Sequence, residues 1–349
     1  MDASRDQERT IGIIADDLTS AADGAGPFVA AGHPALVTRG LAAGSPAVLS
    51  VDTNSRSLAV SDAVAGVTVA AGALAARSIL YKTVDSTLRG HVAAEMAAAL
   101  AASGRDRVVF APAFPDAGRI TRGGRQFVDG QLVSDSAYGA DPVHPVGTSV
   151  LADFLPPGMR AEILDAESQA ELMAKIRSVP DPDRVLFVGS PGMARALADL
   201  VGPGPTLSPS REPVQRVMVV AGSANPLSHR QVEKLRTAAG ALNILTTPTA
   251  RAPDPVAVLS DLVARFRPQF DAFEPEALIA TGGETMGALL QNLSVNAFEL
   301  LGEISPGFPY GRVRLPGRPH PILIGLKAGG FGGADALVHA VGFFQRGAS

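Results

Sequence analysis

Short apolar runs alternate with alanine-rich segments along most of the chain, and this alternation constrains the fold more than any other feature. The apolar runs have the length of strands, and helical segments follow most of them. Such alternation is typical of βαβ units, whose strands lie parallel in one sheet. The sequence therefore predicts an α/β protein with a mainly parallel sheet flanked by helices. The strands expected in the first half are Ile11–Ala15, Ala47–Val51, Ile79–Val84, Arg107–Ala111 and Val185–Val188.

A segment rich in Pro, Gly and Ser interrupts this alternation between Val201 and Pro213. It has no hydrophobic period, which is typical of a linker between domains. The chain has 349 residues, too many for one ordinary core and suited to two. We therefore expect two Rossmann-like α/β domains, at residues 1–205 and 214–349, with a linker at 206–213 and a ligand cleft between the domains.

The alternation restarts after the linker, which predicts the second α/β domain. A Gly/Pro-rich segment separates the third helix of this domain from its last strand. The expected strands are Val217–Val220, Leu242–Leu245, Ala277–Ala280 and Pro321–Leu326, and the expected helices are Ser228–Ala239, Pro255–Phe266, Met286–Leu293 and Ala334–Phe344.

Composition excludes several classes of function. The chain has no cysteine, which excludes disulfides, thiolate nucleophiles and cysteine-ligated metal. The net charge is −4 without a block of Lys or Arg, so nucleic acid is not an expected partner. The histidines show no paired ligand spacing, so we expect no metal held by the protein's own side chains. The apolar stretches are too short to span a membrane and the polar N-terminus is unlike a secretory signal, which predicts a cytoplasmic protein without membrane contact.

Polar residues gather where the predicted strands end, at the edge of a parallel sheet where ligands bind. Asp16 and Asp17 follow the first strand. One aspartate is readily explained as a helix cap, but a second carboxylate beside it needs a cation or a donor-rich ligand. Arg56 lies in the Asp-Thr-Asn-Ser-Arg sequence after the second strand, where it could bind a carboxylate ligand or face water.

The loop KTVDSTLRG, residues 82–90, is the most informative one in the first half. Lys82 precedes the turn and Arg89 ends it, with Asp85 and Ser86 between them and a helix N-terminus next. Cations suit a carboxylate, Asp and Ser suit hydroxyl groups, and a helix N-terminus favours anions. This mixture indicates a site for a polyhydroxylated acid, and the alternative is a surface loop with a Ser/Thr cap.

Three arginines lie among glycines after another predicted strand, at Arg119, Arg122 and Arg125. Guanidinium groups in such a loop could hold a phosphate or a carboxylate. They could equally be solvated loop charges, and the sequence does not choose between the two.

The second half carries three glycine-bearing turns at the ends of predicted strands, in the sequences AGSAN, TGGETMG and KAGGFGG. Backbone N–H groups in such turns can cradle phosphates, so the three together favour a nucleotide. None has the GxxxxGK[ST] pattern of a P-loop, and no GxGxxG follows the first strand. The candidate nucleotide-binding residues are Ser223, Gly282, Gly283, Glu284, Thr285, Gly329 and Gly330.

Taken together, these motifs resemble the four-carbon acid sugar kinases, which phosphorylate threonate, erythronate, 3-oxo-tetronate and related acids. The similarity runs along nearly the whole chain, and TVDSTLRG and GGET are its most specific parts. The other similar stretches are IIADDLTSAAD, DTNSR, PAFPDAGRITRGG, VDGQLV, YGADPVHPV, VGSPGMARAL, AGSAN, PGFPYGRV and LKAGGFG.

The resemblance implies that the N-terminal domain binds the acid sugar and the C-terminal domain binds ATP. It places Asp16, Asp17, Arg56 and the Lys82–Gly90 loop at the acid, and Ser223, Gly282–Thr285 and Gly329–Gly330 at the nucleotide. The sequence departs from the family at two of these turns, with Asn225 where a serine is frequent and Gly330 where an asparagine is usual. The chain also looks shorter than most relatives, around residues 246–275.

Phosphoryl transfer needs alignment, charge neutralisation and a group that takes the hydroxyl proton. We expect Asp17 or Asp85 to accept this proton, and Arg56, Lys82 and Arg89 to hold the carboxylate or steady the phosphoryl group. Asp17, Asp85 and Arg89 are therefore the expected catalytic residues.

Mg²⁺ is the expected companion of ATP, bridging its phosphates, with Glu284 a candidate for a contact through water. The particular acid is left open among threonate, erythronate, a 3-oxo-tetronate and branched acids such as 3-oxo-isoapionate, which differ by one hydroxyl or its stereochemistry. A homodimer is compatible with the sequence.

Two other functions are alternatives for a chain of this fold class. An NAD-dependent hydroxy-acid dehydrogenase would need the dinucleotide fingerprint that the chain lacks. A non-catalytic protein that binds a sugar acid or a nucleotide would not need Lys82, Asp85 and Arg89 beside an intact GGET turn.

Overall fold

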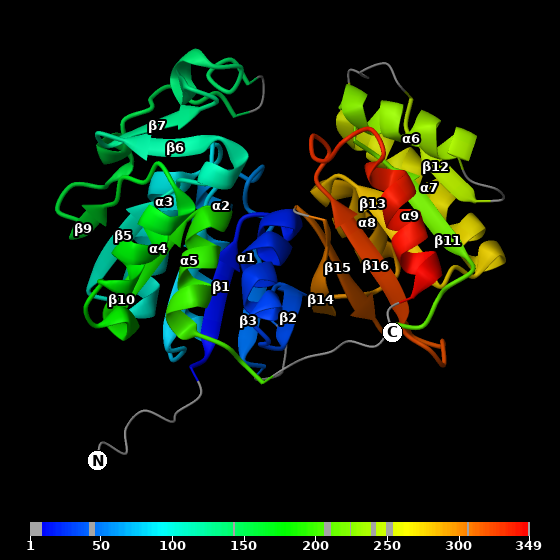
Figure 1. The fold of residues 1–349 in the computed structure, drawn as a ribbon, viewed down its shortest axis with the longest axis horizontal. Coiled ribbons are helices and arrows are strands. Elements are labelled where there is room, and N and C mark those ends of the chain that lie inside the picture. Colours follow the sequence, from blue (N-terminus) through cyan, green and yellow to red (C-terminus); the bar gives the residue numbers. More distant parts are fainter. Residues whose placement is uncertain are drawn as a thin grey trace. The chain divides into compact units, whose positions relative to one another are not determined.

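The structure, a computed structural model, describes residues 9–41, 46–141, 144–205, 211–223, 225–238, 242–248, 254–305 and 307–347. The chain divides into two compact units, Met1–Thr206 and Leu207–Ser349, each of which is described by itself (Figure 1). Residues 206–210 of the predicted linker lie outside the described residues.

The first unit is built on a parallel sheet, as the sequence predicts. Its described strands follow the order β2-β3-β1-β4-β10-β5-β9. Every residue of β1, β3, β4 and β10 is buried, which is typical of parallel strands covered on both faces. The strands are β1 (Ile11–Ala15), β2 (Ala35–Arg39), β3 (Val48–Asp52), β4 (Ile79–Thr83), β5 (Arg107–Ala111), β9 (Ala161–Ile163) and β10 (Val185–Gly189).

Helices cover both faces of this sheet (Figure 1). Gly12 lies against Leu74 of α2, whereas the next residue, Ile13, lies against Gly24 of α1. Successive residues of a strand point to opposite faces, so α1 and α2 lie on opposite sides. α5 contacts α1 and α4, and α3 packs on α2. The helices are α1 (Leu18–Ala30), α2 (Val60–Leu74), α3 (Val92–Ser103), α4 (Gln169–Arg177) and α5 (Pro191–Val201).

A small antiparallel sheet in the first unit was not predicted from the sequence. It consists of β6 (Arg119–Arg122), β7 (Arg125–Val128) and β8 (Gln131–Leu132). Gly123 and Gly124 join β6 to β7, and both have positive φ, the geometry of a tight hairpin turn. The Gly-Gly pair was therefore an available hairpin signal. Short 3₁₀ helices lie at Pro115–Ala117, Val133–Asp135, Leu151–Phe154 and Pro182–Arg184.

The second unit also has an α/β sheet, with strand order β12-β11-β13-β16-β15-β14. The first four strands are parallel, and β15 is antiparallel to both of its neighbours. α6 contacts α9, and α7 contacts α8. The elements are β11 (Val217–Ala221), α6 (Pro226–Ala238), β12 (Asn243–Thr246), α7 (Pro255–Phe273), β13 (Ala277–Thr281), α8 (Gly283–Asn292), β14 (Ala297–Ser305), β15 (Phe308–Val313), β16 (Ile322–Lys327) and α9 (Ala336–Arg346).

Two details of the second unit differ from the sequence-based expectation. The Gly/Pro-rich segment contains β14 and β15, which were missed. The predicted helix ending at Phe266 continues to Phe273, with Pro268 inside it. Phe266 and Phe270 are both buried, with ring centroids 5.1 Å apart, and this packing offsets the hydrogen bond that Pro268 removes.

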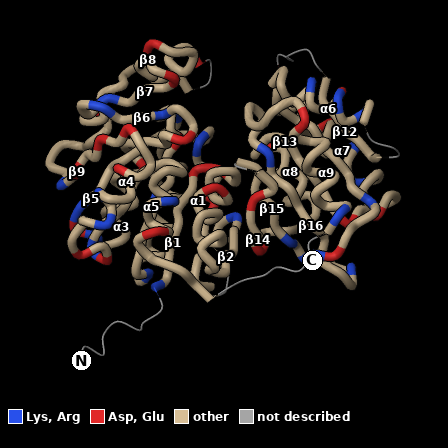
Figure 2. Tube along the Cα trace, viewed as in Figure 1, with Lys and Arg blue, Asp and Glu red and all other residues tan. Residues whose placement is uncertain are grey.

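Charged residues are spread over both units. Lys and Arg alternate with Asp and Glu along the trace rather than gathering on one face (Figure 2). Within the described residues, no helix combines the length and the apolar character that a membrane span requires.

Candidate functional site

An ion pair between Asp16 and Arg56 lies at the centre of a polar cluster in the first unit. Asp16 follows β1 and Arg56 lies in the loop after β3, and β1 and β3 are neighbouring parallel strands. Nε and Nη2 of Arg56 donate to the two carboxylate oxygens of Asp16, at 2.7 and 2.9 Å. Burial acts to raise the pKa of Asp16, but the charges of Arg56 and Lys82 outweigh it and the pKa is lowered. The carboxylate is therefore held ionised.

Asp17 both caps α1 and contacts Arg56. Its Oδ1 accepts a hydrogen bond from the backbone N–H of Ser20 at 2.6 Å, the usual N-cap contact. Its Oδ2 forms an ion pair with Nη1 of Arg56. The Ser20 hydroxyl accepts a further hydrogen bond from Arg56 at 3.0 Å. One guanidinium therefore offsets the charge of two adjacent carboxylates, which explains why they can lie side by side.

The loop after β4 adds a second ion pair, between Asp85 and Arg89. Nε of Arg89 donates to Oδ2 of Asp85 at 2.6 Å, and the Thr87 hydroxyl donates to the same oxygen. Burial acts to raise the pKa of Asp85, but the charges of Arg89 and Arg56 and these hydrogen bonds lower it to about 2. Gly90 has φ +89°, and a Cβ there would lie 3.6 Å from atoms of both Arg56 and Asp16. The two ion pairs thus belong to one cluster.

Lys82 is buried rather than open to solvent. Its side chain is 1 % exposed, and its Nζ lies 2.8 Å from Oε2 of Glu95 in the first turn of α3. The other carboxylate oxygen of Glu95 accepts a hydrogen bond from Ser55 at 2.6 Å. Lys82 therefore acts on Asp16 through its charge. Glu95 was missed as a functional residue, because an acid in an alanine-rich helix shows its partner only once the helix is placed.

The buried side chain of Gln126 links the loop at Ser86 to the antiparallel sheet by a hydrogen bond. The side chain of Gln126 in β7 donates to the Ser86 carbonyl at 2.8 Å, and its own carbonyl accepts from Thr121 at 2.6 Å. This contact holds the loop that carries Asp85. Gln126 was not singled out from the sequence, since a polar residue in a short strand has no distinctive signal.

The structure separates the three arginines of the β6–β7 segment. Arg122 and Arg125 face each other across the hairpin turn, and Arg122 pairs with the exposed Glu167. Arg125 is exposed. Arg119 is half-buried and donates to the Tyr138 hydroxyl at 3.4 Å, and Arg89 stacks over the Tyr138 ring at 5.3 Å. Arg119 thus has a link to the cluster, and the other two are solvated.

Asp52, the last residue of β3, is a further acidic residue that was not predicted to be functional. Its side chain accepts the Asn54 N–H at 2.7 Å, and one of its oxygens lies 3.9 Å from Nε of Arg39. Burial raises its pKa to about 7, and the negative charges of Asp17 and Asp16 also raise it, whereas the hydrogen bond from Asn54 and the charge of Arg39 lower it. Asp52 therefore carries a proton at mildly acidic pH.

In the second unit, the three glycine-bearing turns come together. β11, β13 and β16 are adjacent parallel strands, so the turns after them lie at one edge of the sheet. A Cβ at Gly329 would lie 2.2 Å from Oγ of Ser223, and one at Gly282 would lie 3.2 Å from Oγ1 of Thr285. Gly282 also has φ +98°. These positions require glycine, which allows the turns to approach one another closely.

The remaining predicted nucleotide residues surround these turns. Gly283 begins α8, and Glu284 is exposed in its first turn. At the first departure from the family pattern, the backbone N–H of Asn225 donates to Ser223 at 3.2 Å, and its side chain accepts from Leu227 at 2.9 Å. Gly330, at the second departure, is exposed beside Asn225.

Metal ligands do not gather anywhere in the described part of the chain. No group of three or more His, Cys, Asp or Glu side chains there could hold a metal ion.

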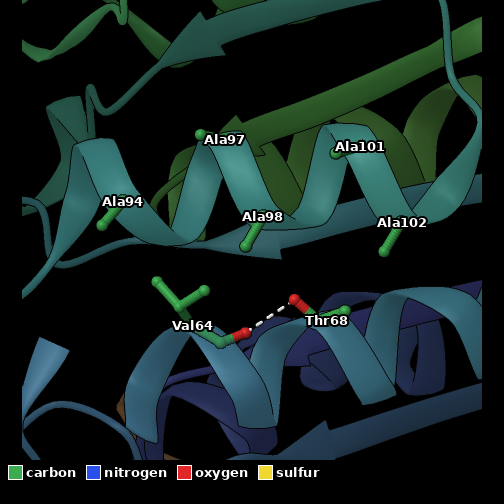
Figure 3. A pocket seen from close by; sticks show the side chains of 7 residues that line it. All are labelled: Val64, Thr68, Ala94, Ala97, Ala98, Ala101 and Ala102. Carbon is green, nitrogen blue, oxygen red and sulfur yellow. Dashed lines mark hydrogen bonds between the residues drawn. The ribbon is translucent and has the colours of Figure 1, made fainter. Parts of the chain in front are cut away.

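An open groove of about 540 Å³ lies between α2 and α3 (Figure 3). Its only polar side chain, Thr68, donates to the Val64 carbonyl at 2.7 Å within α2. The groove therefore offers no charged group to an acid. It is lined by Val64, Thr68, Ala94, Ala97, Ala98, Ala101 and Ala102.

Two family models match the chain, one in each unit. A model described as a sugar-binding N-terminal domain matches residues 11–163, which include the cluster around Arg56. A model described as a nucleotide-binding C-terminal domain matches residues 251–337, which include the turns at Gly282 and Gly329. Ser223 lies before this second match.

Curated relatives match over almost the whole chain. A D-threonate kinase of Cupriavidus necator is 32 % identical over 406 aligned residues, which cover 94 % of this chain and 96 % of the relative. A 3-oxo-tetronate kinase of Pectobacterium atrosepticum is 26 % identical, with 95 % of this chain and 98 % of the relative covered. The 406 aligned positions exceed the 349 residues of this chain, so the first relative has residues that this chain lacks.

Solved structures share the fold. A protein of Haemophilus influenzae matches with a TM-score of 0.74 at 21 % identity, covering 95 % of this chain and 100 % of that chain. A domain of unknown function from Bordetella bronchiseptica, a domain-swapped dimer with bound citrate, matches with a TM-score of 0.52 at 29 % identity, covering 95 % and 97 %. The predicted fold class of two α/β domains is thus confirmed.

Replacing Glu95 by Ala is expected to destabilise the protein by about 3–5 kcal/mol, because the buried ammonium of Lys82 loses its partner. Replacing both residues, as Lys82→Met with Glu95→Leu, is expected to recover most of this loss while lowering activity, because the charge beside Asp16 is gone. Urea unfolding measures both changes. The control is Asp106→Asn, which removes an exposed ion pair with Arg184. A Glu95→Ala loss no larger than that of the control would contradict the assignment.

The raised pKa of Asp52 predicts a pH-dependent stability. The folded state holds a proton that the unfolded chain has already lost, so the contribution is full at low pH and is lost as pH rises through about 7. Between pH 5 and 8 the loss is on the order of 2 kcal/mol. Unfolding curves for Asp52→Asn should lack this decline, whereas the exposed Asp62→Asn should retain it. Parallel curves for the wild type and Asp52→Asn would refute the prediction.

Proposed function

Because the chain belongs to the family of the four-carbon acid sugar kinases, we propose that it transfers a phosphoryl group from ATP to a hydroxyl of a small sugar acid. Threonate, erythronate, a 3-oxo-tetronate and 3-oxo-isoapionate are the proposed substrates. The observation that carries the proposal is the cluster of Asp16, Asp17, Arg56, Asp85 and Arg89 in the unit that matches the sugar-binding model. Such a cluster offers cations to a carboxylate and carboxylates to hydroxyl groups.

The two arginines of the cluster are the proposed carboxylate ligands. The side chains of Arg56 and Arg89 are 20 % and 29 % exposed, so an acid can reach both. Lys82, at 1 % exposed, contributes charge from within. Asp16 and Ser86 are the proposed partners of the substrate hydroxyls, together with the carboxylates of Asp17 and Asp85.

Asp17 is the proposed acceptor of the hydroxyl proton. Its side chain is 23 % exposed, against 14 % for Asp85 and 6 % for Asp16. Asp85 has a pKa of about 2, which makes its carboxylate a weak base. In this assignment Asp85 orients Arg89 toward the carboxylate of the acid.

The second unit is the proposed ATP site. The turns at Ser223, Gly282–Thr285 and Gly329–Gly330 fit a phosphate chain, because added side chains would fill the space between them. Mg²⁺ would neutralise charge on the phosphates, and the exposed Glu284 could reach it through a water molecule.

A dimer is also part of the proposal. The Bordetella bronchiseptica relative is a domain-swapped dimer, and a second copy of this chain is therefore the proposed protein partner. A dehydrogenase is not favoured, because the relatives are kinases and the chain lacks a dinucleotide fingerprint.

The reaction is tested by coupled release of ADP from ATP over a panel of four-carbon and branched sugar acids. At least one acid is expected to give Mg²⁺-dependent turnover, with a phosphorylated acid as the product by mass spectrometry. NAD with the same acids should give no absorbance change. ADP release that no acid in the panel stimulates would contradict the proposal.

Asp17→Asn is expected to lower kcat by about 10²–10⁴-fold, because a general base is lost while the cap oxygen remains. Asp85→Asn is expected to raise the KM for the acid more than it lowers kcat, since Arg89 loses its orienting partner. Steady-state kinetics at saturating ATP measures both, with the exposed Asp62→Asn as the control. Near-wild-type kcat in Asp17→Asn would exclude Asp17 as the proton acceptor.

A further inference from the structure

We infer that Lys327 is a positioning residue for the nucleotide. Its buried ammonium gathers the carbonyl groups of the glycine-rich loop that follows it, and this leaves the N–H groups of the loop for phosphate. The inference rests on the proposed ATP site and adds to it a lysine that was not among the predicted site residues.

The hydrogen bonds of the Lys327 ammonium group go to the loop after β16. The side chain is 2 % exposed. Its Nζ donates to the carbonyl oxygens of Ala328 at 2.8 Å, Gly329 at 3.2 Å and Phe331 at 3.0 Å. An ammonium group has three N–H donors, so these carbonyls use all of them. The lysine is therefore committed to the shape of the loop rather than to a carboxylate.

Two side chains from α6 hold the same loop. The Ser228 hydroxyl donates to the Gly329 carbonyl at 2.9 Å. The Gln231 side chain donates to Gly333 at 2.8 Å and to Phe331 at 3.2 Å. Buried side chains therefore donate hydrogen bonds to the carbonyl oxygens of Ala328, Gly329, Phe331 and Gly333.

Most backbone N–H groups of the loop have no hydrogen-bond acceptor among the described residues. Phe331 donates to the Ala328 carbonyl at 3.1 Å, but no described residue accepts a hydrogen bond from the N–H of Gly329, Gly330, Gly332 or Gly333. Successive N–H groups without protein acceptors form an anion-binding nest.

The loop position also depends on these contacts. Gly329 lies so close to Ser223 that a Cβ there would come within 2.2 Å of the serine Oγ. If the loop shifts, its N–H groups move relative to Ser223 and Gly282, the other parts of the proposed phosphate site. Loss of the Lys327 contacts should therefore weaken nucleotide binding and leave the binding of the acid at the proposed site in the first unit unchanged.

The hydrogen bonds of Lys327 to the loop depend on pH, because they require the charged ammonium group. Burial lowers the pKa of Lys327 to about 8. The neutral amine has only two N–H donors and a lone pair that would face a carbonyl oxygen. Nucleotide affinity should therefore fall as pH rises through about 8. Other titratable or charged groups on the surrounding elements are His229, Arg230, Glu233, Lys234 and Arg236 of α6, Glu284 of α8, Tyr310 and Arg312 of β15, and Asp335, His339 and Arg346 at or within α9.

The test measures ADP binding by calorimetry between pH 6.5 and 9.5 in the full chain. The wild-type Kd is expected to rise about tenfold across this range, the equivalent of one charge-assisted hydrogen bond. Lys327→Met should bind ADP at least tenfold more weakly at pH 7 and show no pH dependence. Its KM for the acid should be unchanged.

Three control variants separate a titrating lysine from a merely structural one. Ser228→Ala removes a neutral contact to the same loop and should weaken ADP binding while keeping the pH dependence. His229→Gln should keep both the affinity and the pH dependence. Lys234→Met, which removes an exposed lysine paired with Asp335, should behave as the wild type.

The protonation of the Lys327 amine can be followed directly, because the chain has only four lysines, Lys82, Lys175, Lys234 and Lys327. NMR of labelled lysine side chains should show one group that titrates near pH 8 and is absent from Lys327→Met. If that variant fails to fold, the wild-type titration and Ser228→Ala still decide. A Lys327 amine titrating near its ordinary value, or Lys327→Met with wild-type ADP binding, would overturn the inference. A wild type that binds no ADP would overturn the ATP site itself.

Discussion

The guanidinium of Arg56 is the group on which the polar cluster of the first unit depends. It contacts both carboxylate oxygens of Asp16, one of Asp17 and the hydroxyl of Ser20. Without it, two adjacent carboxylates would share a largely buried position and at least one would take up a proton. Its charge also helps to keep Asp85 ionised. One arginine therefore allows the carboxylates of Asp16, Asp17 and Asp85 to lie close together in the folded protein.

The sheet explains how this arginine reaches its partners. β1, β3 and β4 lie side by side and parallel, so the loops after them open at one edge. Residues distant in sequence, such as Asp16, Arg56 and Asp85, meet there. The second unit repeats the arrangement with glycine-bearing turns after β11, β13 and β16. The same topology thus provides a charged site in one unit and a backbone site in the other.

Features that follow from hydrophobic periodicity and from local motifs could be predicted from the sequence. The strand ends located the paired aspartates, the KTVDSTLRG loop and the glycine-bearing turns, because a parallel sheet gathers such residues at one edge. Residues whose roles depend on a hydrogen-bond or ion-pair partner, or on burial, were missed. Glu95, Asp52 and Lys327 are ordinary residues in the sequence, and their roles appear only when the partner or the lack of solvent is known. The strands β14 and β15 were missed because Gly and Pro interrupt them, although hairpin pairing tolerates both at these positions.

A structure of the chain with ADP and the sugar acid that supports turnover would show whether the two ligands bind where we propose. We expect the acid in the first unit, with its carboxylate within hydrogen-bond distance of Arg56 or Arg89 and a hydroxyl within reach of Asp17. We expect the diphosphate at the turns of Ser223, Gly282 and Gly329. An acid bound away from the Arg56 cluster would rule out the proposed acid site.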